Sequence, residues 1–241
     1  MAYTTVDNPE LYFQVKLHTG DGGGGSLTFD GSEDMAPDLV WSKSRSGALN
    51  HTLFDSVRGA GSNKELTPNG YGAEGGAASA TWGYLSAFDS DGFTWLAGST
   101  NAENFNTSSA TYVHWCWKAG TTSGITGSPS ITPTSYSFNS TSGFSIIKFD
   151  GTGSAATLPH GLGTSDIGMM IIKNTADVDE GWSVFNKSLG NTHGIKLNSS
   201  GAAGDDTKYW NDTSPTSTLF TIGDGGEVNG SSNTMIAYCF A

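Results

Sequence analysis

The chain has 241 residues, enough for one large β domain or two smaller ones. Charged residues make up 14% of the chain and there are 34 glycines, so the composition disfavours long surface helices and favours strands and turns. The net charge of −12 has no local Lys/Arg cluster to offset it and repels phosphate backbones and anionic lipid, so we expect neither nucleic acid nor a membrane as partner.

The first residues, MAYTTVDNPE, lack the basic and apolar regions of a secretory signal peptide. No apolar run approaches the length that spans a membrane. We therefore expect a protein made in a reducing cytoplasm, with free cysteines.

The strand-like segments are short and bounded by Gly, Asn, Asp or Ser, and no long segment of helical period lies between them. This pattern predicts antiparallel sheets packed face to face, as in a β-sandwich or jelly roll. In chain order the segments are 11–17, 26–29, 38–44, 51–57, 92–97 and 112–118, then 145–149, 169–174, 182–186, 219–223 and 235–240. The alternating stretch 130–138 also favours a strand that opens the second half of the chain.

The chain contains an internal repeat. Phe13 to Gly22 aligns with Phe144 to Gly153, and Leu39 to Lys43 aligns with Met169 to Lys173, with apolar, polar and Gly positions coinciding. We predict a first β-sandwich repeat over 1–119, a Gly/Ser/Thr-rich junction over 120–129 and a second repeat over 130–241. Two separate sandwiches and two halves of one are both open, and we favour two, because each copy has its own central strand that is apolar on both faces.

The segment YVHWCWKA, 112–119, places a histidine two residues before a cysteine, as a thiolate nucleophile and its base could be. In the second copy it aligns with MIAYCFA, which keeps the cysteine, Cys239, and replaces His114 by Ala237. A catalytic pair should not lose its base. We therefore predict that Cys116 and Cys239 are small buried core residues and that His114 is dispensable.

Other candidate motifs are better explained by turns. The run GDGGGGS, 20–26, predicts a hairpin turn, since no helix pattern follows to bind a phosphate. Asp89 to Gly92 and Asp177 to Glu180 are typical of tight turns and do not complete a calcium loop. The five histidines lack zinc-site spacing, so we expect no metal. We likewise expect no cofactor and no catalytic residues.

Aromatic residues outside the repeated segments are the candidate binding residues. Exposed aromatics on loops can stack on sugar rings or contact a neighbouring subunit. Those in the Gly/Ala-rich insertion 69–84 and in the corresponding variable region of the second copy are Tyr71, Trp82, Tyr84, Tyr209 and Trp210.

The segments PDLVWSKSRS, SAFDSDGFTW, ATYVHWCWKAG, GFSIIKFDGTG and NGSSNTMIAYCFA resemble an uncharacterised repeat family of marine bacteriophages, including phages of cyanobacteria. The resemblance covers nearly the whole chain. It implies a concanavalin-like β-sandwich and a virion structural or tail-fibre-like protein, and it carries no catalytic residues to this sequence.

These observations lead to one principal hypothesis and two rivals. The principal one is a non-enzymatic virion protein, made in the host bacterial cytoplasm, exposed as a capsid (head) decoration or tail-associated appendage, and contacting other virion proteins, including further copies of itself. The first rival is a carbohydrate-binding host adhesin that uses the loop aromatics on host surface glycans. The second is a polysaccharide hydrolase, which would need two carboxylates facing each other across a cleft.

Overall fold

The computed structural model describes residues 6–241, which divide into two compact units. The first comprises the chain up to Pro68 together with Glu74–Ala119, and the second comprises Asn69–Ala73 with Gly120–Ala241. Antiparallel strands are the main regular secondary structure of both units, so the predicted all-β fold class is confirmed.

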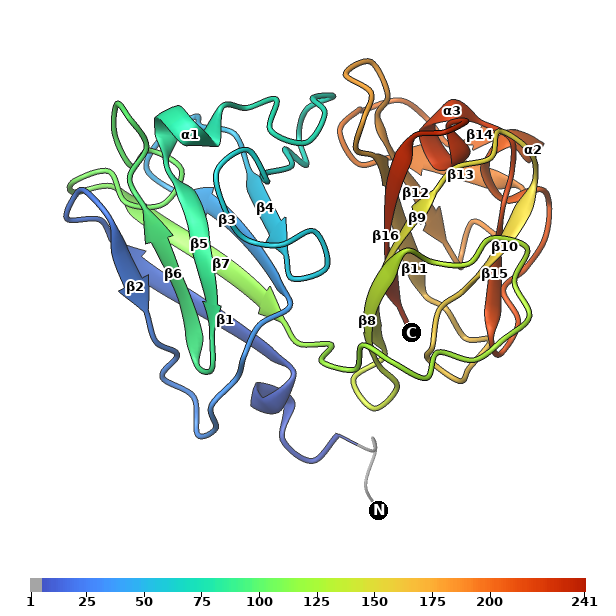
Figure 1. Ribbon diagram of the computed structural model, residues 1–241, viewed down its shortest axis with the longest axis horizontal. Helices are drawn as coiled ribbons and strands as arrows, with labels where there is room; N and C mark the ends of the chain where they lie inside the picture. The colour runs from blue at the N-terminus through green and yellow to red at the C-terminus, as the bar shows by residue number, and fades with distance from the viewer. Residues whose placement is uncertain (1–5) are drawn as a thin grey trace. The chain divides into compact units, whose positions relative to one another are not determined.

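The first unit contains two antiparallel sheets (Figure 1). One has the strand order β1-β7-β3-β4 and the other the order β2-β6-β5. In the four-stranded sheet the strands are β1 (Phe13–Thr19), β7 (Thr111–Trp117), β3 (Leu39–Ser44) and β4 (Thr52–Asp55); in the other they are β2 (Gly25–Leu27), β6 (Gly92–Leu96) and β5 (Tyr84–Asp89).

The core of the first unit lies between these sheets. Val40 and Cys116 come from the four-stranded sheet, while Leu85 and Phe93 come from the three-stranded one, and all four are buried in one cluster. Strand alternation places every second side chain on this inner face, which makes the unit β-sandwich-like.

The second unit has a seven-stranded sheet and a two-stranded sheet. The larger has the order β14-β13-β12-β11-β16-β9-β8, and the smaller pairs β10 with β15. The strands are β8 (Ser135–Asn139), β9 (Phe144–Asp150), β10 (Ala156–Pro159), β11 (Met169–Asn174), β12 (Trp182–Asn186), β13 (His193–Lys196), β14 (Gly204–Asp205), β15 (Leu219–Ile222) and β16 (Thr234–Phe240).

The core of the second unit also joins its two sheets. Phe149, Ile172 and Cys239 from the large sheet are buried with Leu158 and Phe220 from the small one. Cys116 and Cys239 are both free and buried, as predicted. Each lies on the inner face of the strand that ends its unit.

Helices are confined to single turns in the described part of the chain. They are η1 (Pro9–Leu11), α1 (Ser79–Trp82), α2 (Thr207–Trp210) and α3 (Gly226–Asn229). None of the helices in residues 6–241 is long and apolar enough to cross a membrane.

The GDGGGGS run is not a hairpin turn, contrary to the prediction. It links β1, which pairs with β7, to β2, which pairs with β6, and therefore carries the chain from one sheet to the other. The error arises because Gly-rich turns look alike in sequence whether the strands they join pair or diverge.

The same corner occurs in both units and is built in the same way. A Cβ on Gly20 would lie 2.2 Å from the carbonyl oxygen of Thr107, and one on Gly151 would lie 2.2 Å from that of Gly230. Beside each glycine a buried asparagine, Asn106 or Asn229, binds the corner with its side chain. The backbones approach so closely there that only glycine fits.

Candidate functional site

The five predicted aromatic residues occupy different environments. Trp82 and Tyr71 are exposed, with 36% and 50% of their surface accessible. Tyr84 lies in β5 and Tyr209 in α2, and both are partly buried against the cores. The described chain therefore presents two of the five to solvent.

Trp210 is fully buried, so its prediction as an exposed binding residue is wrong. Its indole packs edge-on against Phe185 and donates its N–H to the carbonyl oxygen of His193 at 3.0 Å. A buried ring with a satisfied N–H is a core residue and cannot contact a glycan. Tyr84 was expected on a loop and instead lies in a strand.

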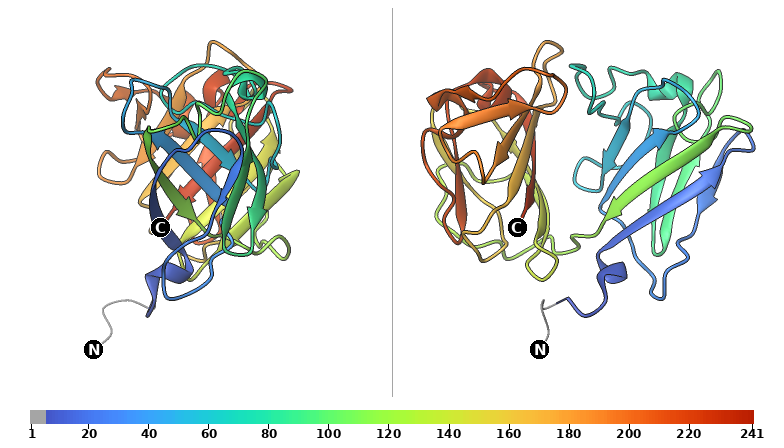
Figure 2. Two further views of the ribbon diagram at one scale, coloured as in Figure 1. Left: turned by 90° about the vertical axis from the view of Figure 1, so that its left-hand side faces the viewer. Right: turned by 180° about the vertical axis from the view of Figure 1, so that it is seen from behind.

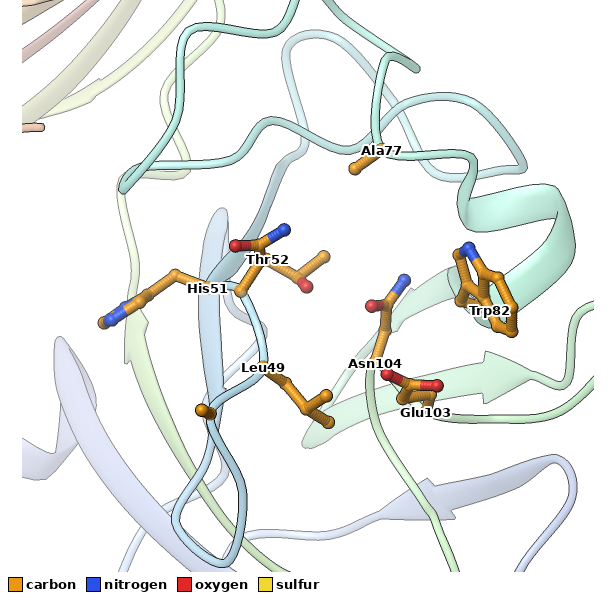
Figure 3. Close-up of a pocket in the computed structure, with 9 residues that line it drawn as sticks. Leu49, His51, Thr52, Ala77, Trp82, Glu103 and Asn104 are labelled. Carbon is orange, nitrogen blue, oxygen red and sulfur yellow. The ribbon is translucent and has the colours of Figure 1, made fainter.

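Trp82 borders a cavity of about 220 Å³ in the first unit. Figure 3 shows the space, with Trp82 and Glu103 on one side, Leu49 and Thr52 on the other, and Asn104 between them. The cavity thus combines an exposed indole with an amide, a carboxylate and a hydroxyl. Its lining residues are Ala48, Leu49, Asn50, His51, Thr52, Ala77, Trp82, Glu103 and Asn104.

A buried carboxylate holds the turn that carries Trp82. Glu65 accepts hydrogen bonds from the backbone N–H of Ala77 at 3.0 Å and of Ser79 at 3.1 Å, and from the Ser79 hydroxyl. Ala78 between them adopts a left-handed backbone, with φ of 55°. Glu65 therefore compensates a strained turn and fixes the start of α1.

Asn104 is hydrogen-bonded directly to the turn that carries Trp82. Its backbone N–H donates to the Trp82 carbonyl oxygen at 2.9 Å, and its side-chain amide donates to the Gly83 carbonyl oxygen at 2.8 Å. The neighbouring Glu103 accepts the Tyr112 hydroxyl on its backbone carbonyl at 2.8 Å. Trp82, Glu103 and Asn104 are thus held by backbone contacts in a preformed geometry.

His51 lines both the Trp82 cavity and an apolar hollow formed with Trp41, Trp115 and Trp117. Its ring points away from the cavity in Figure 3, and its Nδ1 accepts the indole N–H of Trp41 at 2.9 Å. Burial, and then the charge of Lys43, lower the pKa of His51. The hydrogen bond leaves the proton of the neutral ring on Nε2.

The His114 and Cys116 pair has no nucleophilic geometry. Burial raises the pKa of the Cys116 thiol well above its ordinary value. His114 is fully buried and uses Nδ1 to contact the Ser42 hydroxyl at 2.7 Å and Nε2 to contact His18 Nδ1 at 2.9 Å. These contacts argue against the expectation that His114 is dispensable, because its removal would take a hydrogen-bond partner from the buried Ser42 hydroxyl and from the partly buried His18 ring.

The acidic segments behave as turns where the structure describes them. Asp89 and Gly92 close the β5–β6 hairpin, and Asp91 accepts the backbone N–H of Met35 at 3.2 Å. Asp177 accepts the N–H of Asp179 at 2.9 Å. Within residues 6–241 no group of three or more His, Cys, Asp or Glu side chains is placed to hold a metal ion.

Sequence reasoning found Trp82 and missed the residues that face it. Glu103 and Asn104 align with Gly226 and Glu227 of the second copy at the offset of 123 that aligns Cys116 with Cys239. Positions where two otherwise similar copies differ in polar character could have indicated this loop. Ala48, Leu49, Thr52 and Ala77 carry no such signal.

Comparison with known proteins identifies a family for the chain, but the description of that family gives no function. No curated protein and no solved structure matches it. Residues 8–241, which include the described parts of both units, match one family. The chain belongs to the family described as Domain of unknown function (DUF7483).

Proposed function

We propose that this is a non-enzymatic glycan-binding protein and that the Trp82 cavity of the first unit is its binding site. The observation that carries the proposal is the combination of an exposed indole at the rim with the Asn104 amide and the Glu103 carboxylate. An indole face covers the C–H face of a sugar ring, while amides and carboxylates bind its hydroxyls. The small volume suits one terminal or branching sugar unit rather than a long chain.

Binding fits the cavity better than hydrolysis does. Glu103 is the one carboxylate among the described residues that line it. Glycoside hydrolysis uses two carboxyl groups that flank the scissile bond. A lone carboxylate beside an indole instead resembles a hydrogen-bond acceptor for sugar hydroxyls.

A glycan array tests this proposal with matched variants. The wild-type chain should be retained on a subset of glycans, and Trp82→Ala should weaken retention about tenfold or more, which corresponds to about 1.4 kcal/mol. Tyr71→Ala is the control, because Tyr71 is also exposed but does not line the cavity. Equal retention of Trp82→Ala and wild type, or no retention of wild type on any glycan, would refute it.

We also infer that the units are tandem copies of one antiparallel β-sandwich of the jelly-roll, concanavalin-like type. The order β1-β7-β3-β4 in the first unit parallels β9-β16-β11-β12 in the second, and the β2-β6 pair parallels β10-β15. The aligned sequence segments fall on these corresponding strands. The Gly20 and Gly151 corners add support, because they share both contacts and spacing.

A second proposal concerns where the protein acts. The resemblance to marine-phage repeat proteins supports a place on the virion surface, as a head decoration or tail-associated appendage among other virion proteins. The glycans would then be those of the host surface. Mass spectrometry of purified particles tests this setting: the chain should be found in the particle, and its consistent absence would contradict the proposal.

A further inference from the structure

We propose that β1 is an assembly edge that pairs antiparallel with β1 of a second copy, with Val15 on the two-fold axis. The proposal is independent of glycan binding, since β1 contributes no residue to the Trp82 cavity. Joining two four-stranded sheets in this way would give one continuous sheet of eight strands.

No strand in residues 6–241 pairs with the outer edge of β1, so its backbone offers a row of hydrogen-bonding groups there. In the described chain β1 is the terminal strand of its sheet, with β7 on one side and no strand on the other (Figure 2, right). Lys118 donates to the Tyr12 carbonyl and Gly20 donates to the Ala110 carbonyl. Antiparallel alternation therefore turns the even residues of β1 toward β7 and the odd residues, including Val15, outward.

Three of the four outward residues carry apolar side chains that are exposed, and the fourth is Thr19. Phe13, Val15 and Leu17 are 37%, 46% and 54% accessible. The charged residue of the strand, Lys16, lies on the other face and pairs with Asp30 at 2.8 Å. A charge on an edge strand usually discourages pairing, and this one is engaged within the unit.

The second unit shows how the equivalent edge is completed. Its strand β9, which aligns with β1, is flanked by β8, with Ser135 opposite Lys148 and Asn139 opposite Phe144. Phe144 and Ile146, the counterparts of Phe13 and Val15, are buried. In the first unit the described chain before β1 forms η1 instead of a strand, so the position filled by β8 is open.

Side-chain complementarity selects the register. With Val15 at the axis, Phe13 lies opposite Leu17 of the partner subunit, and Gln14 lies opposite Lys16 of the partner subunit. Apolar side chains then meet on one face, and no like charges meet on the other. An axis at Lys16 would place two ammonium groups directly opposite each other, which is unfavourable.

The surface that β1 pairing would bury sets the expected strength of the dimer. A groove of about 270 Å³, lined by Glu10, Phe13, Gln14, Val15, Asp30 and Gly31, runs beside the edge. One pair of strands buries less surface than the roughly 800 Å² per partner that a stable interface buries. We therefore expect a weak dimer whose population rises with protein concentration, suited to dense packing of many copies.

Sedimentation equilibrium of the full chain, followed up to millimolar concentration, is the first test. The wild type should show a reversible monomer–dimer equilibrium, and Val15→Lys should weaken it at least tenfold. Val178→Lys is the matched control, because Val178 is an exposed valine of the second unit, 61% accessible against 46% for Val15. A monomer at every concentration, or equal dimerisation of Val15→Lys and wild type, would overturn the proposal.

Cysteine cross-linking tests the register. Val15→Cys should form a disulfide-linked dimer under mild oxidation, because paired Cα atoms lie about 5.5 Å apart at such a position. Leu17→Cys should not, since its own copies would lie about 13 Å apart along the strand. Cys116 and Cys239 are buried and do not compete. Cross-linking of Leu17→Cys but not of Val15→Cys would overturn the assigned register.

Discussion

His114 makes buried hydrogen bonds in the first unit and is replaced by an apolar residue, Ala237, in the second. The buried Ser42 hydroxyl and the partly buried His18 ring hydrogen-bond to the two ring nitrogens of His114. At the aligned positions the second unit has only apolar side chains. These counterparts of Ser42, His114 and His18 are Ile172, Ala237 and Phe149.

We expect His114→Ala to lower the free energy of unfolding by about 2–4 kcal/mol, because it leaves a cavity and two unsatisfied polar groups. The triple variant Ser42→Ile, His114→Ala, His18→Phe should be closer to wild type than the single variant. Urea denaturation of the three proteins checks both statements. A single variant within 0.5 kcal/mol of wild type, on the scale of typical surface substitutions, would show that the hydrogen-bonded set contributes little.

The same histidine predicts a pH dependence of stability. Burial, and then the neighbouring His18, lower the pKa of His114 from 6.5 to about 3. Between these values the unfolded chain binds a proton that the folded chain does not. Stability from this group is therefore complete above pH 6.5 and falls toward pH 3, by up to about 1.4 kcal/mol per pH unit.

Urea midpoints measured at intervals from pH 7 down to pH 4.5 test this dependence. His114→Gln should show a shallower loss of stability than wild type, because the amide does not titrate. Carboxylates titrate at the lower end in both proteins, so the difference between the two curves reports on His114 together with the His18 ring bonded to it. Parallel curves would contradict the assigned pKa.

The two cysteines should be inert in the folded protein. Burial raises the pKa of Cys239 to about 12 and moves that of Cys116 in the same direction. Neither thiol should react with a maleimide until the chain is denatured. Cys→Ala at either position should cost about 1 kcal/mol, read from urea denaturation, whereas rapid labelling of native Cys116 would place it outside the core.

At the scale of elements, Gly20 and Gly151 allow the close backbone approach at the corners where the chain passes from one sheet to the other. Gly20→Ala and Gly151→Ala should each lower stability by about 1–3 kcal/mol, since the new methyl group would collide with a backbone carbonyl 2.2 Å away. Gly201→Ala is the control, because its nearest neighbour is the side-chain oxygen of Ser199 at 3.4 Å. Thermal or urea unfolding gives the comparison, and tolerance at both corners would contradict the close approach.

Short apolar runs bounded by turn residues predicted much of the fold, because such runs mark buried strands such as β7 and β16, which are apolar on both faces. Four strands, β5, β10, β13 and β14, were not predicted. Tyr84 shows why for β5: the Gly/Ala-rich composition before it indicates a loop, and its pairing with β6 depends on contacts distant in sequence. Similarly, the burial of Trp210 depends on Phe185 and His193, which no local pattern reveals.

At the scale of the whole molecule, we propose that the two units are copies of one framework that have come to differ at particular sites. The indole at the Trp82 cavity comes from the part of the Gly/Ala-rich insertion that belongs to the first unit, 74–84, and the edge that corresponds to β1 is covered by β8 in the second unit. We infer that duplication supplied the framework and that the differences between the units supply binding and assembly. Binding at Trp82 is therefore the central claim.

Indole N–H resonances of the full chain give the most direct test of that claim. The chain has seven tryptophans, and Trp82→Phe assigns one resonance by removing it. On titration with a retained glycan, the Trp82 resonance should shift in a saturable way, while that of buried Trp210 stays fixed. A stationary Trp82 resonance under conditions where the glycan is bound would contradict the account and place the binding site elsewhere.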